Sequence, residues 1–459
     1  MGKKLRDDFL WGNSVSSMQT EGAWNEGGKG KSVYDIREAS EFASDWKVAT
    51  DSYHRYEEDF DWMNELGMNC YRFQISWSRV FPNGDGEINE EGVAFYERFI
   101  DALLERGIEP MICLYHFDMP LYLAETYNGF LSRDVVDAFV RYGKAMVDRF
   151  KGKVKYWITF NEQNIFGFSG AFTIGGVMTG ENTEKELYQL QHNTMMAHAE
   201  IANYIHETAP NSEIGGMVAY SKVYPATPKP EDVFAAQKLD DFFNQFFLEV
   251  FTYGKYPAFM TTYLENHGLT PDMREDDLEV LAKLTSDWLS FSYYASHVVS
   301  AENITETTPV YRYLEVGKIA NEYLEATEWD WQIDPLGFRS ILTDMYSRYH
   351  LPVFPIENGI GVIEELPEEG LVQDDYRISY HRDHFQAMKD AIFLDGVDCI
   401  GYLGWGLIDI LSSQGDMRKR YGVVYVNREN HDLKDLKRIP KKSFAWLQKV
   451  IKSNGESLE

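Results

Sequence analysis

Eight short apolar segments alternate along the chain with longer segments of helical periodicity, and this alternation limits the possible folds more than any other feature. The short segments are rich in β-branched and aromatic residues, which is typical of buried strands. We predict strands at residues 9–19, 69–76, 109–114, 155–160, 213–219, 287–294, 352–356 and 398–404. We predict helices at residues 50–66, 92–105, 134–150, 186–209, 240–252, 334–349 and 379–395.

Strands that alternate with helices predict a parallel sheet that is covered on both faces. A chain of 459 residues is also long enough for two or three smaller domains, or for an open doubly wound sheet. Eight units without a domain-sized change in composition favour one closed (β/α)₈ TIM barrel over residues 1–459. Its longest loops are expected near residues 25–49, 222–240 and 301–330.

The charge of the chain restricts its partners. A net charge of −29 argues against nucleic acid and against an anionic membrane surface, because both require a cationic footprint. The 15% content of aromatic residues is compatible with stacking against sugar rings, and equally with a large core. The sequence leaves the oligomeric state open, so a homo-oligomer is one alternative.

The cysteines and the N-terminal segment indicate a compartment. Cys70, Cys113 and Cys399 lie in apolar runs, and three cysteines give no disulfide framework, which fits a reducing cytosol. The first residues, MGKKLRDDFLWG, contain no apolar stretch long enough for a signal peptide, and no run approaches the roughly 18 apolar residues of a membrane span. We therefore expect a cytoplasmic protein.

Two of the predicted strands end at a glutamate. The run Tyr156–Phe160 leads to Glu162, and the run VFPI at 353–356 leads to Glu357. A carboxylate at the end of a buried strand is costly unless it is paired or used in chemistry. Two such ends could place two carboxyl groups on opposite sides of the mouth of a barrel. A pair of carboxyl groups is what a glycosidase requires to cleave a glycosidic bond. With 73 acidic residues in the chain, simple salt-bridge roles are the alternative.

Other polar and aromatic residues share the same position at strand ends. In a TIM barrel the functional residues lie at the carboxyl ends of the strands. The candidates at those ends are Gln19, His116, Asn161, Glu162, Tyr294, Glu357 and Trp405. Without further information, a core histidine and core aromatic residues would explain His116, Tyr294 and Trp405 equally well.

Seven ordered motifs resemble glycoside hydrolase family 1, the retaining β-glucosidase family. They are FLWGNSVSSMQTEG, YRFQISWSRVFP, LYHFDMP, TFNEQN, FSYY, IENG and KRYG, and they run from Phe9 to the C-terminal part of the chain. The resemblance implies a (β/α)₈ barrel, no metal or other cofactor, and retention of configuration at the anomeric carbon.

The resemblance also implies roles for individual residues. Glu162 matches the family's acid/base and Glu357 its nucleophile. Gln19, His116, Asn161 and Trp405 match the residues that hold the sugar, and Tyr294 matches the tyrosine that steadies the nucleophile. Arg72 matches the arginine beneath the nucleophile, where a cation would favour an ionised carboxylate, although a purely structural ion pair is an alternative. Glu162 must start protonated, so we expect burial and the charge of Glu357 to raise its pKa.

The departures from the common family pattern point to the substrate. Ser292 replaces an asparagine in the sixth strand, and the glutamate that binds the 4- and 6-hydroxyls in ordinary β-glucosidases is missing from GLIDILSSQGDMRKRYG. Ser412, Lys419 and Tyr421 instead resemble the phosphate-binding triplet of the 6-phospho-β-glycosidases. A phosphate carries roughly −1.5 to −2 charges, so a hydroxyl, an ammonium and a phenol suit it better than a carboxylate. A solvated basic turn is the alternative for Lys419.

These observations predict a retaining 6-phospho-β-glucosidase whose partner is a small phosphorylated β-glycoside, such as cellobiose 6′-phosphate or an aryl glucoside 6-phosphate. The galactoside-specific relatives tend to have a tryptophan where this chain has Ser413, which favours glucosides. A 6-phospho-β-galactosidase, an ordinary β-glucosidase and a catalytically silent sugar-phosphate sensor are the alternatives. The aglycone and the physiological substrate are not encoded in these motifs.

Overall fold

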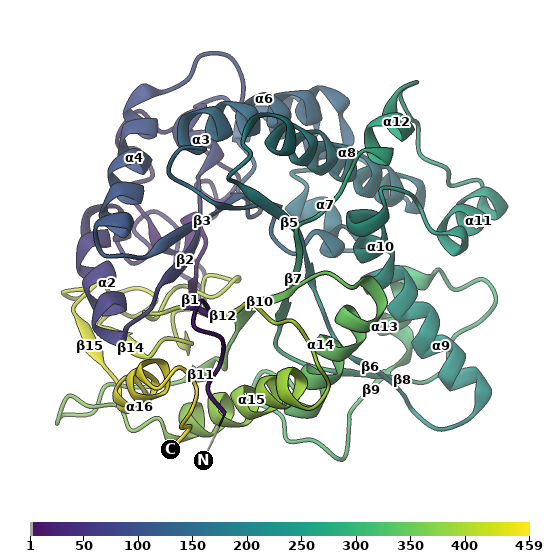
Figure 1. Ribbon diagram of the computed structural model, residues 1–459. Helices are drawn as coiled ribbons and strands as arrows, with labels where there is room; N and C mark the ends of the chain where they lie inside the picture. The colour runs from purple at the N-terminus through teal and green to yellow at the C-terminus, as the bar shows by residue number, and fades with distance from the viewer. Residues whose placement is uncertain (1–2) are drawn as a thin grey trace.

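Eight parallel strands form the centre of the computed structural model, which describes residues 3–459. Figure 1 looks along the barrel that these strands surround, with the helices outside them. The strands are β1 (Leu10–Ser14), β2 (Cys70–Gln74), β3 (Glu109–Tyr115), β4 (Tyr156–Phe160), β5 (Glu213–Ala219), β7 (Trp288–Tyr293), β10 (Val353–Asn358) and β12 (Gly401–Trp405). Their order is β10-β7-β5-β4-β3-β2-β1-β12, so neighbours in space follow the chain.

The ring is closed between its first and last strands. A parallel bridge joins Val353 to Cys399, and the amide of Val353 donates to the carbonyl of Asp398 at 2.9 Å. The amide of Ile400 donates back to the carbonyl of Val353 at 3.1 Å. The prediction of a closed (β/α)₈ barrel is therefore confirmed.

Amphipathic helices cover the outside of the strands. The larger ones are α2 (Ser52–Leu66), α4 (Glu90–Glu105), α6 (Arg133–Phe150), α8 (Glu184–Thr208), α14 (Pro335–Tyr349), α15 (Asp375–Phe393) and α16 (Lys442–Lys452). Each of the first six lies within a few residues of a helix predicted from the apolar spacing. The amide of Leu5 donates to the carbonyl of Asn454 at 3.1 Å, so the two ends of the described chain meet, as Figure 1 also shows.

Shorter elements complete the connections between strands and helices. They are α1 (Ser17–Thr20), α3 (Trp77–Val80), α5 (Leu121–Tyr127), η1 (Gly129–Leu131), η2 (Gln163–Gly167), α7 (Ala171–Ile174), β6 (Val223–Pro225), α9 (Pro230–Asp240), η3 (Asp241–Gln245), α10 (Phe246–Tyr253), α11 (Ala258–His267), α12 (Asp277–Ala282), β8 (His297–Val299), η4 (Val310–Arg312), α13 (Tyr313–Gly317), β9 (Lys318–Ile319), β11 (Val362–Ile363), β13 (Lys419–Arg420), β14 (Val424–Val426) and β15 (Arg438–Pro440).

Several element boundaries differ from the prediction. The strand expected at 9–19 ends at Ser14, and the short helix α1 follows it, because the small polar residues there supply no further apolar alternation. The loop expected at 222–240 contains β6 and α9, and α9 continues through the π-helical turn η3 into α10. Pro230 at the first position of α9 is a helix-start signal that this prediction overlooked.

Two apolar layers hold the barrel together. The inner one fills the ring with side chains from alternate positions of the strands, including Cys70, Met111, Ile158, Phe354 and Leu403. The outer one lies between the strands and the helices. Alternation along each strand separates the two layers, because successive side chains point to opposite faces.

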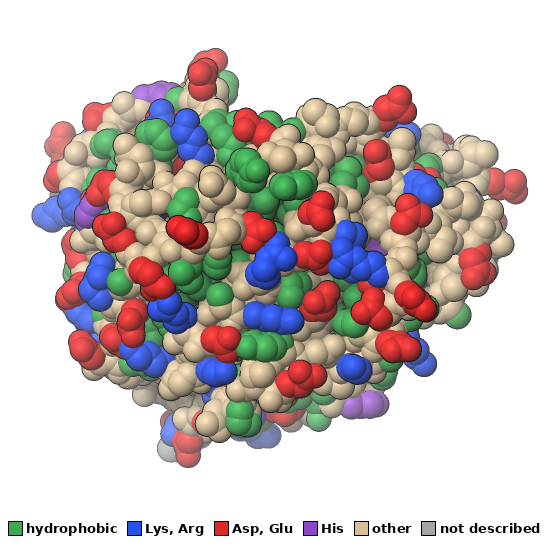
Figure 2. Space-filling model, turned by 90° about the horizontal axis from the view of Figure 1, so that it is seen from above, with side chains coloured by type: hydrophobic (Ala, Val, Ile, Leu, Met, Phe, Trp, Pro, Cys, Tyr) green, Lys and Arg blue, Asp and Glu red, His purple; other side chains and the backbone are tan. Residues whose placement is uncertain are grey.

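The surface carries many charged side chains, as expected for a chain with 73 acidic and 44 basic residues. On the face shown in Figure 2, acidic and basic side chains are interspersed, with many acidic groups along the rim. None of the helices within residues 3–459 is both long enough and apolar enough to cross a lipid bilayer.

We expect Leu403→Ala to lower the free energy of unfolding by about 2–5 kcal/mol, because it leaves a cavity in the inner layer, where Leu403 is fully buried. Urea denaturation measures this change. Leu278→Ala is the matched control, since Leu278 is 61% exposed on α12 and its loss should change stability by no more than about 0.5 kcal/mol. Equal losses in the two variants would contradict the assignment of Leu403 to the inner core.

Candidate active site

A cavity of about 310 Å³ opens at the carboxyl ends of the barrel strands. Both predicted catalytic glutamates line it: Glu162 follows β4 by two residues, and Glu357 is the penultimate residue of β10. The prediction that Glu357 directly follows its strand is wrong, because the strand extends two residues further, to Asn358. Gln19, His116, Tyr294, Trp405 and Tyr421 line the same cavity, so most of the predicted residues are brought together.

A β-bulge aims Glu357 into the cavity. Phe354 and Ile356 both belong to the inner layer, so strict alternation would turn Glu357 away from it. The pairing of β10 with β7 shifts between Pro355 and Glu357, which leaves Ile356 without a partner. Such a bulge re-aims the following side chain, and bulges are common beside active sites.

Arg72 and Tyr294 hold the Glu357 carboxylate. Arg72 donates from Nη1 to Glu357 Oε1, and the Tyr294 hydroxyl donates to Oε2 at 3.0 Å. Burial raises the pKa of Glu357, while the Arg72 cation and both hydrogen bonds act in the opposite direction. This pairing provides what an ionised carboxylate in a buried site requires.

Arg72 is itself placed by the alternation of β2. It lies two positions after Cys70, which belongs to the inner layer, so its side chain also enters the barrel, where it is fully buried. Its Nη2 donates to Asn161 Oδ1 at 2.7 Å. One guanidinium therefore orients Glu357 and the residue that precedes Glu162.

Glu162 lies in a different environment. Its backbone adopts a left-handed conformation with φ of 43°, an unusual one for a non-glycine residue and one often found at functional sites. The Ser292 hydroxyl donates to Glu162 Oε1. Burial, followed by the negative charge of Glu357, raises the pKa of Glu162 to about 8. Within residues 3–459 Glu162 forms no ion pair, so it is the carboxyl group of the two that is suited to carry a proton at neutral pH.

Gln19, His116 and Trp405 also line the cavity, while Asn161 lies next to Glu162 in the chain and is 1% exposed. Gln19 donates from Nε2 to the carbonyl of Leu411 at 2.7 Å, and its Oε1 accepts from Ser16 at 2.5 Å. The rings of His116 and Trp405 have centroids 5.7 Å apart. Within the described residues, the buried His116 Nδ1 and Asn161 Nδ2 have no hydrogen-bond partner. These atoms are suited to polar groups of a ligand, since buried polar atoms are normally paired.

Lys419 lies beside the cavity and not in bulk water. Its side chain is 9% exposed, and its Nζ is 3.5 Å from the ring centroid of Trp331 and 4.9 Å from that of Trp329. Within residues 3–459, no carboxylate lies within 4.0 Å of this ammonium. Burial lowers the pKa of Lys419 to about 8, against the opposing effect of Glu328. The alternative of a solvated basic turn is therefore wrong for this residue.

The two other phosphate candidates differ in their placement. Tyr421 lines the cavity, and its ring centroid is 6.3 Å from that of Tyr294. The Ser412 hydroxyl instead accepts hydrogen bonds from the amides of Gln414 and Asp416, at 3.3 and 3.0 Å, and so stabilises its own turn. It is the neighbouring Ser413 that lines the cavity.

Sequence reasoning missed several residues at this site. The contact of Ser292 with Glu162 could have been expected, because Ser292 and Tyr294 are two positions apart in the predicted strand 287–294 and would share a face. Trp329 and Trp331 carried no such signal, since they lie in a long loop without periodicity. Among residues 3–459, no three His, Cys, Asp or Glu side chains are grouped as a metal site would require.

The geometry defines a class of protein: two glutamates at the carboxyl ends of barrel strands, facing one ligand-sized cavity, form the arrangement of a glycoside hydrolase. The sequence model described as Glycosyl hydrolase family 1 matches residues 1–456. The chain belongs to glycosyl hydrolase family 1.

Individual relatives are similar over nearly their whole length. The aryl-phospho-β-D-glucosidase BglH of Bacillus subtilis (strain 168) is 42% identical over 469 residues, which cover 99% of each chain. A 6-phospho-β-glucosidase of Clostridium longisporum is 40% identical and covers 98% of each chain. Among solved structures, a family 1 β-glucosidase from Thermotoga maritima has a TM-score of 0.88 at 31% identity, with 99% of each chain covered.

The pKa of Glu162 yields a prediction for the pH profile. Glu162 donates its proton only below its pKa, so kcat/KM for an unphosphorylated aryl β-glucoside should fall as pH rises through about 8. Glu162→Gln should abolish this alkaline decline and lower kcat for a substrate with a poor leaving group by roughly 10²–10⁴-fold. Initial rates between pH 6 and 10 test both expectations.

Glu200→Gln is the matched control for this profile. Burial also raises the pKa of Glu200, which lies on α8 and does not line the cavity. The control should retain the alkaline decline. Persistence of the decline in Glu162→Gln would show that another group is the acid.

Proposed function

We propose that this protein hydrolyses 6-phospho-β-glucosides with retention of configuration, and that Lys419 binds the phosphate. One observation carries the proposal: Lys419 is a buried ammonium beside the cavity, and no carboxylate of residues 3–459 lies within 4.0 Å of it. A buried charge without a counter-charge is unfavourable, and the rings of Trp329 and Trp331 compensate only part of that penalty. A substrate phosphate would provide the missing negative charge.

The relatives support the same substrate class. Both curated relatives described above are named for action on phosphorylated β-glucosides. We extend that activity to this chain because Tyr421 lines the cavity, Lys419 lies beside it, and the glutamate that binds the 4- and 6-hydroxyls in ordinary β-glucosidases is missing from this loop. Ser412 could still donate its hydroxyl hydrogen, since only its oxygen is engaged as an acceptor.

We assign glucosides in preference to galactosides on the basis of Ser413. Family members that act on 6-phospho-galactosides tend to have a tryptophan at this position, and here the small Ser413 lines the cavity. Rates on the glucoside and galactoside 6-phosphates compare the two directly. A phosphorylated sugar does not cross a bilayer unaided, because its charge makes membrane entry costly, so we also propose that the reaction takes place in the cytoplasm.

The first half of the proposed reaction forms a covalent intermediate. A Glu357 carboxylate oxygen attacks the anomeric carbon while Glu162 gives its proton to the glycosidic oxygen, so the aglycone leaves as an alcohol. Arg72 and Tyr294 keep Glu357 oriented and ionised for the attack. Asn161 Nδ2 is suited to donate to the sugar 2-hydroxyl, a contact that strengthens in the transition state.

The second half releases the sugar phosphate. Once Glu357 is esterified, its negative charge no longer raises the pKa of Glu162, which can then lose its proton. Glu162 removes a proton from water, the resulting hydroxide attacks the anomeric carbon, and Glu357 departs as a carboxylate. The product keeps the β configuration because two inversions have occurred.

Lys419→Ala should lower the ratio of kcat/KM for a nitrophenyl β-glucoside 6-phosphate to that for the unphosphorylated glucoside. A decrease of roughly 10–100-fold is expected, equivalent to the loss of one charge-assisted hydrogen bond. Initial-rate kinetics on the two substrates give the ratio. Equal rates on both substrates in the wild-type protein would refute the phosphate proposal.

The pH dependence should differ between the same two substrates. Glu162 and Lys419 each have a pKa of about 8, and both must be protonated to process a phosphorylated substrate. Well above pH 8, log kcat/KM should therefore fall with a slope approaching −2 for the 6-phosphate but −1 for the plain glucoside, about one unit per essential proton. Parallel slopes would exclude Lys419 as the phosphate ligand.

A further inference from the structure

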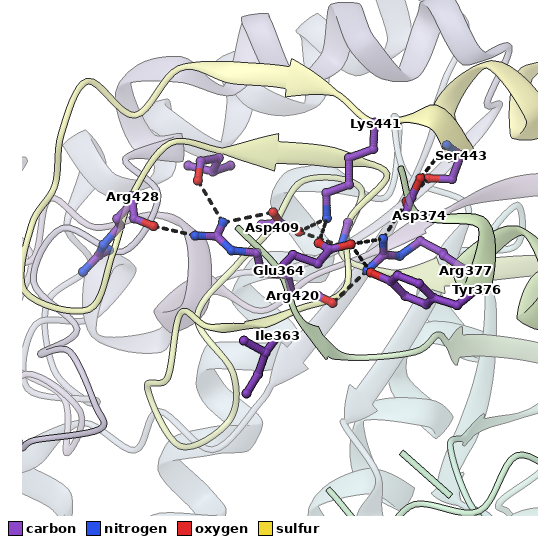
Figure 3. A network of polar contacts seen from close by, with 12 residues as sticks. Ile363, Glu364, Asp374, Tyr376, Arg377, Asp409, Arg420, Arg428, Lys441 and Ser443 are labelled. Atoms are coloured by element: carbon purple, nitrogen blue, oxygen red, sulfur yellow. Dashed lines mark hydrogen bonds and ion pairs between the residues drawn. The ribbon is translucent and has the colours of Figure 1, made fainter. Parts of the chain in front are cut away.

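The strand that carries Lys419 has two different faces. In β13 (Lys419–Arg420), successive side chains point to opposite sides. Lys419 turns toward Trp331 and the cavity, whereas Arg420 turns into the protein and is 3% exposed. Figure 3 shows Arg420 among charged side chains that come from separate parts of the chain.

Arg420 is one member of a buried ion network that contains three carboxylates and three cations. We define the buried ion network as Glu364, Asp374, Arg377, Asp409, Arg420 and Lys441. All six side chains are nearly or fully inaccessible to solvent, and their charges balance. Such a network must be fully paired, because a single unpaired member would be very unfavourable.

The pairs form a continuous chain of contacts. Arg420 donates to Asp409 at 3.0 Å, and Lys441 donates to the same carboxylate at 2.8 Å. Lys441 also reaches Glu364 at 2.5 Å. Arg377 then joins Glu364 to Asp374, at 2.7 and 2.6 Å. The network therefore connects α15, the loop after β12 and the segment before α16.

The same network holds the backbone on both sides of Tyr421. Arg377 Nη2 donates to the carbonyl of Arg420 at 3.0 Å, and the amide of Gly422 donates to Asp409 Oδ1 at 3.0 Å. The Arg420 guanidinium also donates to the carbonyls of Val426 and Arg428, at 2.9 and 2.6 Å. Lys419 and Tyr421 thus belong to a segment whose backbone is held by ionic side chains.

A second strand ties this segment to the nucleophile. β11 (Val362–Ile363) pairs with β13, and Glu364 of the buried ion network follows β11 directly. Gly361 packs so closely that a Cβ there would lie 2.8 Å from Lys419 Cγ and 2.8 Å from Tyr421 Cζ. Gly361 is four positions after Glu357, so the strand of the nucleophile leads directly to the phosphate candidates.

We infer that Arg420 is a positioning residue for substrate specificity: through the buried ion network it fixes the segment 419–422 so that the Lys419 ammonium meets the 6-phosphate. This inference rests on the proposed function. A cation contributes to recognition only if its position is fixed before the ligand binds, because ordering a long side chain reduces affinity. Among residues 3–459, no carboxylate lies within 4.0 Å of Lys419, so its position depends on the backbone of its strand and on the rings of Trp329 and Trp331.

Arg420→Met tests the inference with the nitrophenyl β-glucoside and its 6-phosphate. Asp409 keeps Lys441 and the Gly422 amide as partners, so the substitution leaves no isolated carboxylate. We expect the phosphorylated-to-unphosphorylated ratio of kcat/KM to fall by about tenfold or more, in line with the sensitivity of bound geometry to small displacements. The change should lie in the KM of the phosphorylated substrate and not in its kcat.

Arg418→Met is the matched control. Arg418 is next to the same strand, but its side chain is 45% exposed and pairs with Asp416 outside the network. The phosphorylated-to-unphosphorylated ratio of kcat/KM of this variant should stay within about twofold of wild type, as expected for the loss of an exposed ion pair. Arg420→Lys should retain part of the wild-type preference for the phosphorylated substrate. It keeps a cation beside Asp409 but lacks the guanidinium that donates to the carbonyls of Val426 and Arg428.

A double-mutant cycle separates positioning from general stability. In the Lys419→Ala background, Arg420→Met should produce no further fall in the ratio, because the group that it positions is gone. If Arg420→Met does not fold, Arg420→Lys carries the test, because it keeps a cation beside Asp409 and loses the contacts with the carbonyls of Val426 and Arg428. A fall in activity that is equal for both substrates would overturn the positioning role.

The outcomes also distinguish this inference from the proposed function. If wild-type kcat/KM is about the same for the phosphorylated and the unphosphorylated glucoside, the proposed function and the inference are both overturned. A high wild-type ratio that falls in Lys419→Ala but is unchanged in Arg420→Met overturns only the positioning role of Arg420.

Discussion

The guanidinium of Arg72 lies inside the barrel without access to solvent, and its contact with Glu357 sets the chemistry of the site. A buried cation of this kind is tolerated only with a partner. It pairs with Glu357, whereas Glu162 accepts a hydrogen bond from the neutral Ser292 hydroxyl, so the two carboxyl groups have different proton affinities although both are buried. Because Arg72 also contacts Asn161, the same cation links the segments that carry both glutamates.

The cavity combines two electrostatic regions. Near the barrel axis, the negative charge of Glu357 is paired with Arg72. Beside Trp331, the positive charge of Lys419 lies among aromatic rings, and no carboxylate in the described part of the chain is within 4.0 Å of it. A neutral sugar ring with a charged group at one end would match this distribution, since the opposite charges stay separated by the length of the ligand.

Much of this arrangement could be predicted from the sequence, because it follows from periodicity. The eight strands and most helices were recognisable from apolar spacing, and the convergence of strand ends brought Glu162, Glu357, His116 and Trp405 to one place. The β-bulge at Ile356 and the left-handed backbone of Glu162 were not predictable, since both depend on neighbouring strands and not on a local pattern. Trp331 and the orientation of Ser412 depend on loop conformation, where sequence patterns carry least information.

The short connection between β10 and β11 fixes the separation between Glu357 and the strand that carries Lys419. Only three residues, 359–361, separate the end of β10, which carries Glu357, from β11, which pairs with the strand of Lys419. The separation of Glu357 and Lys419 along the backbone is therefore set by paired strands and not by a long loop. In the proposed complex, the distance from the reacting carbon to the phosphate must match this separation, so an isomer with the phosphate on a different carbon could not contact Glu357 and Lys419 together.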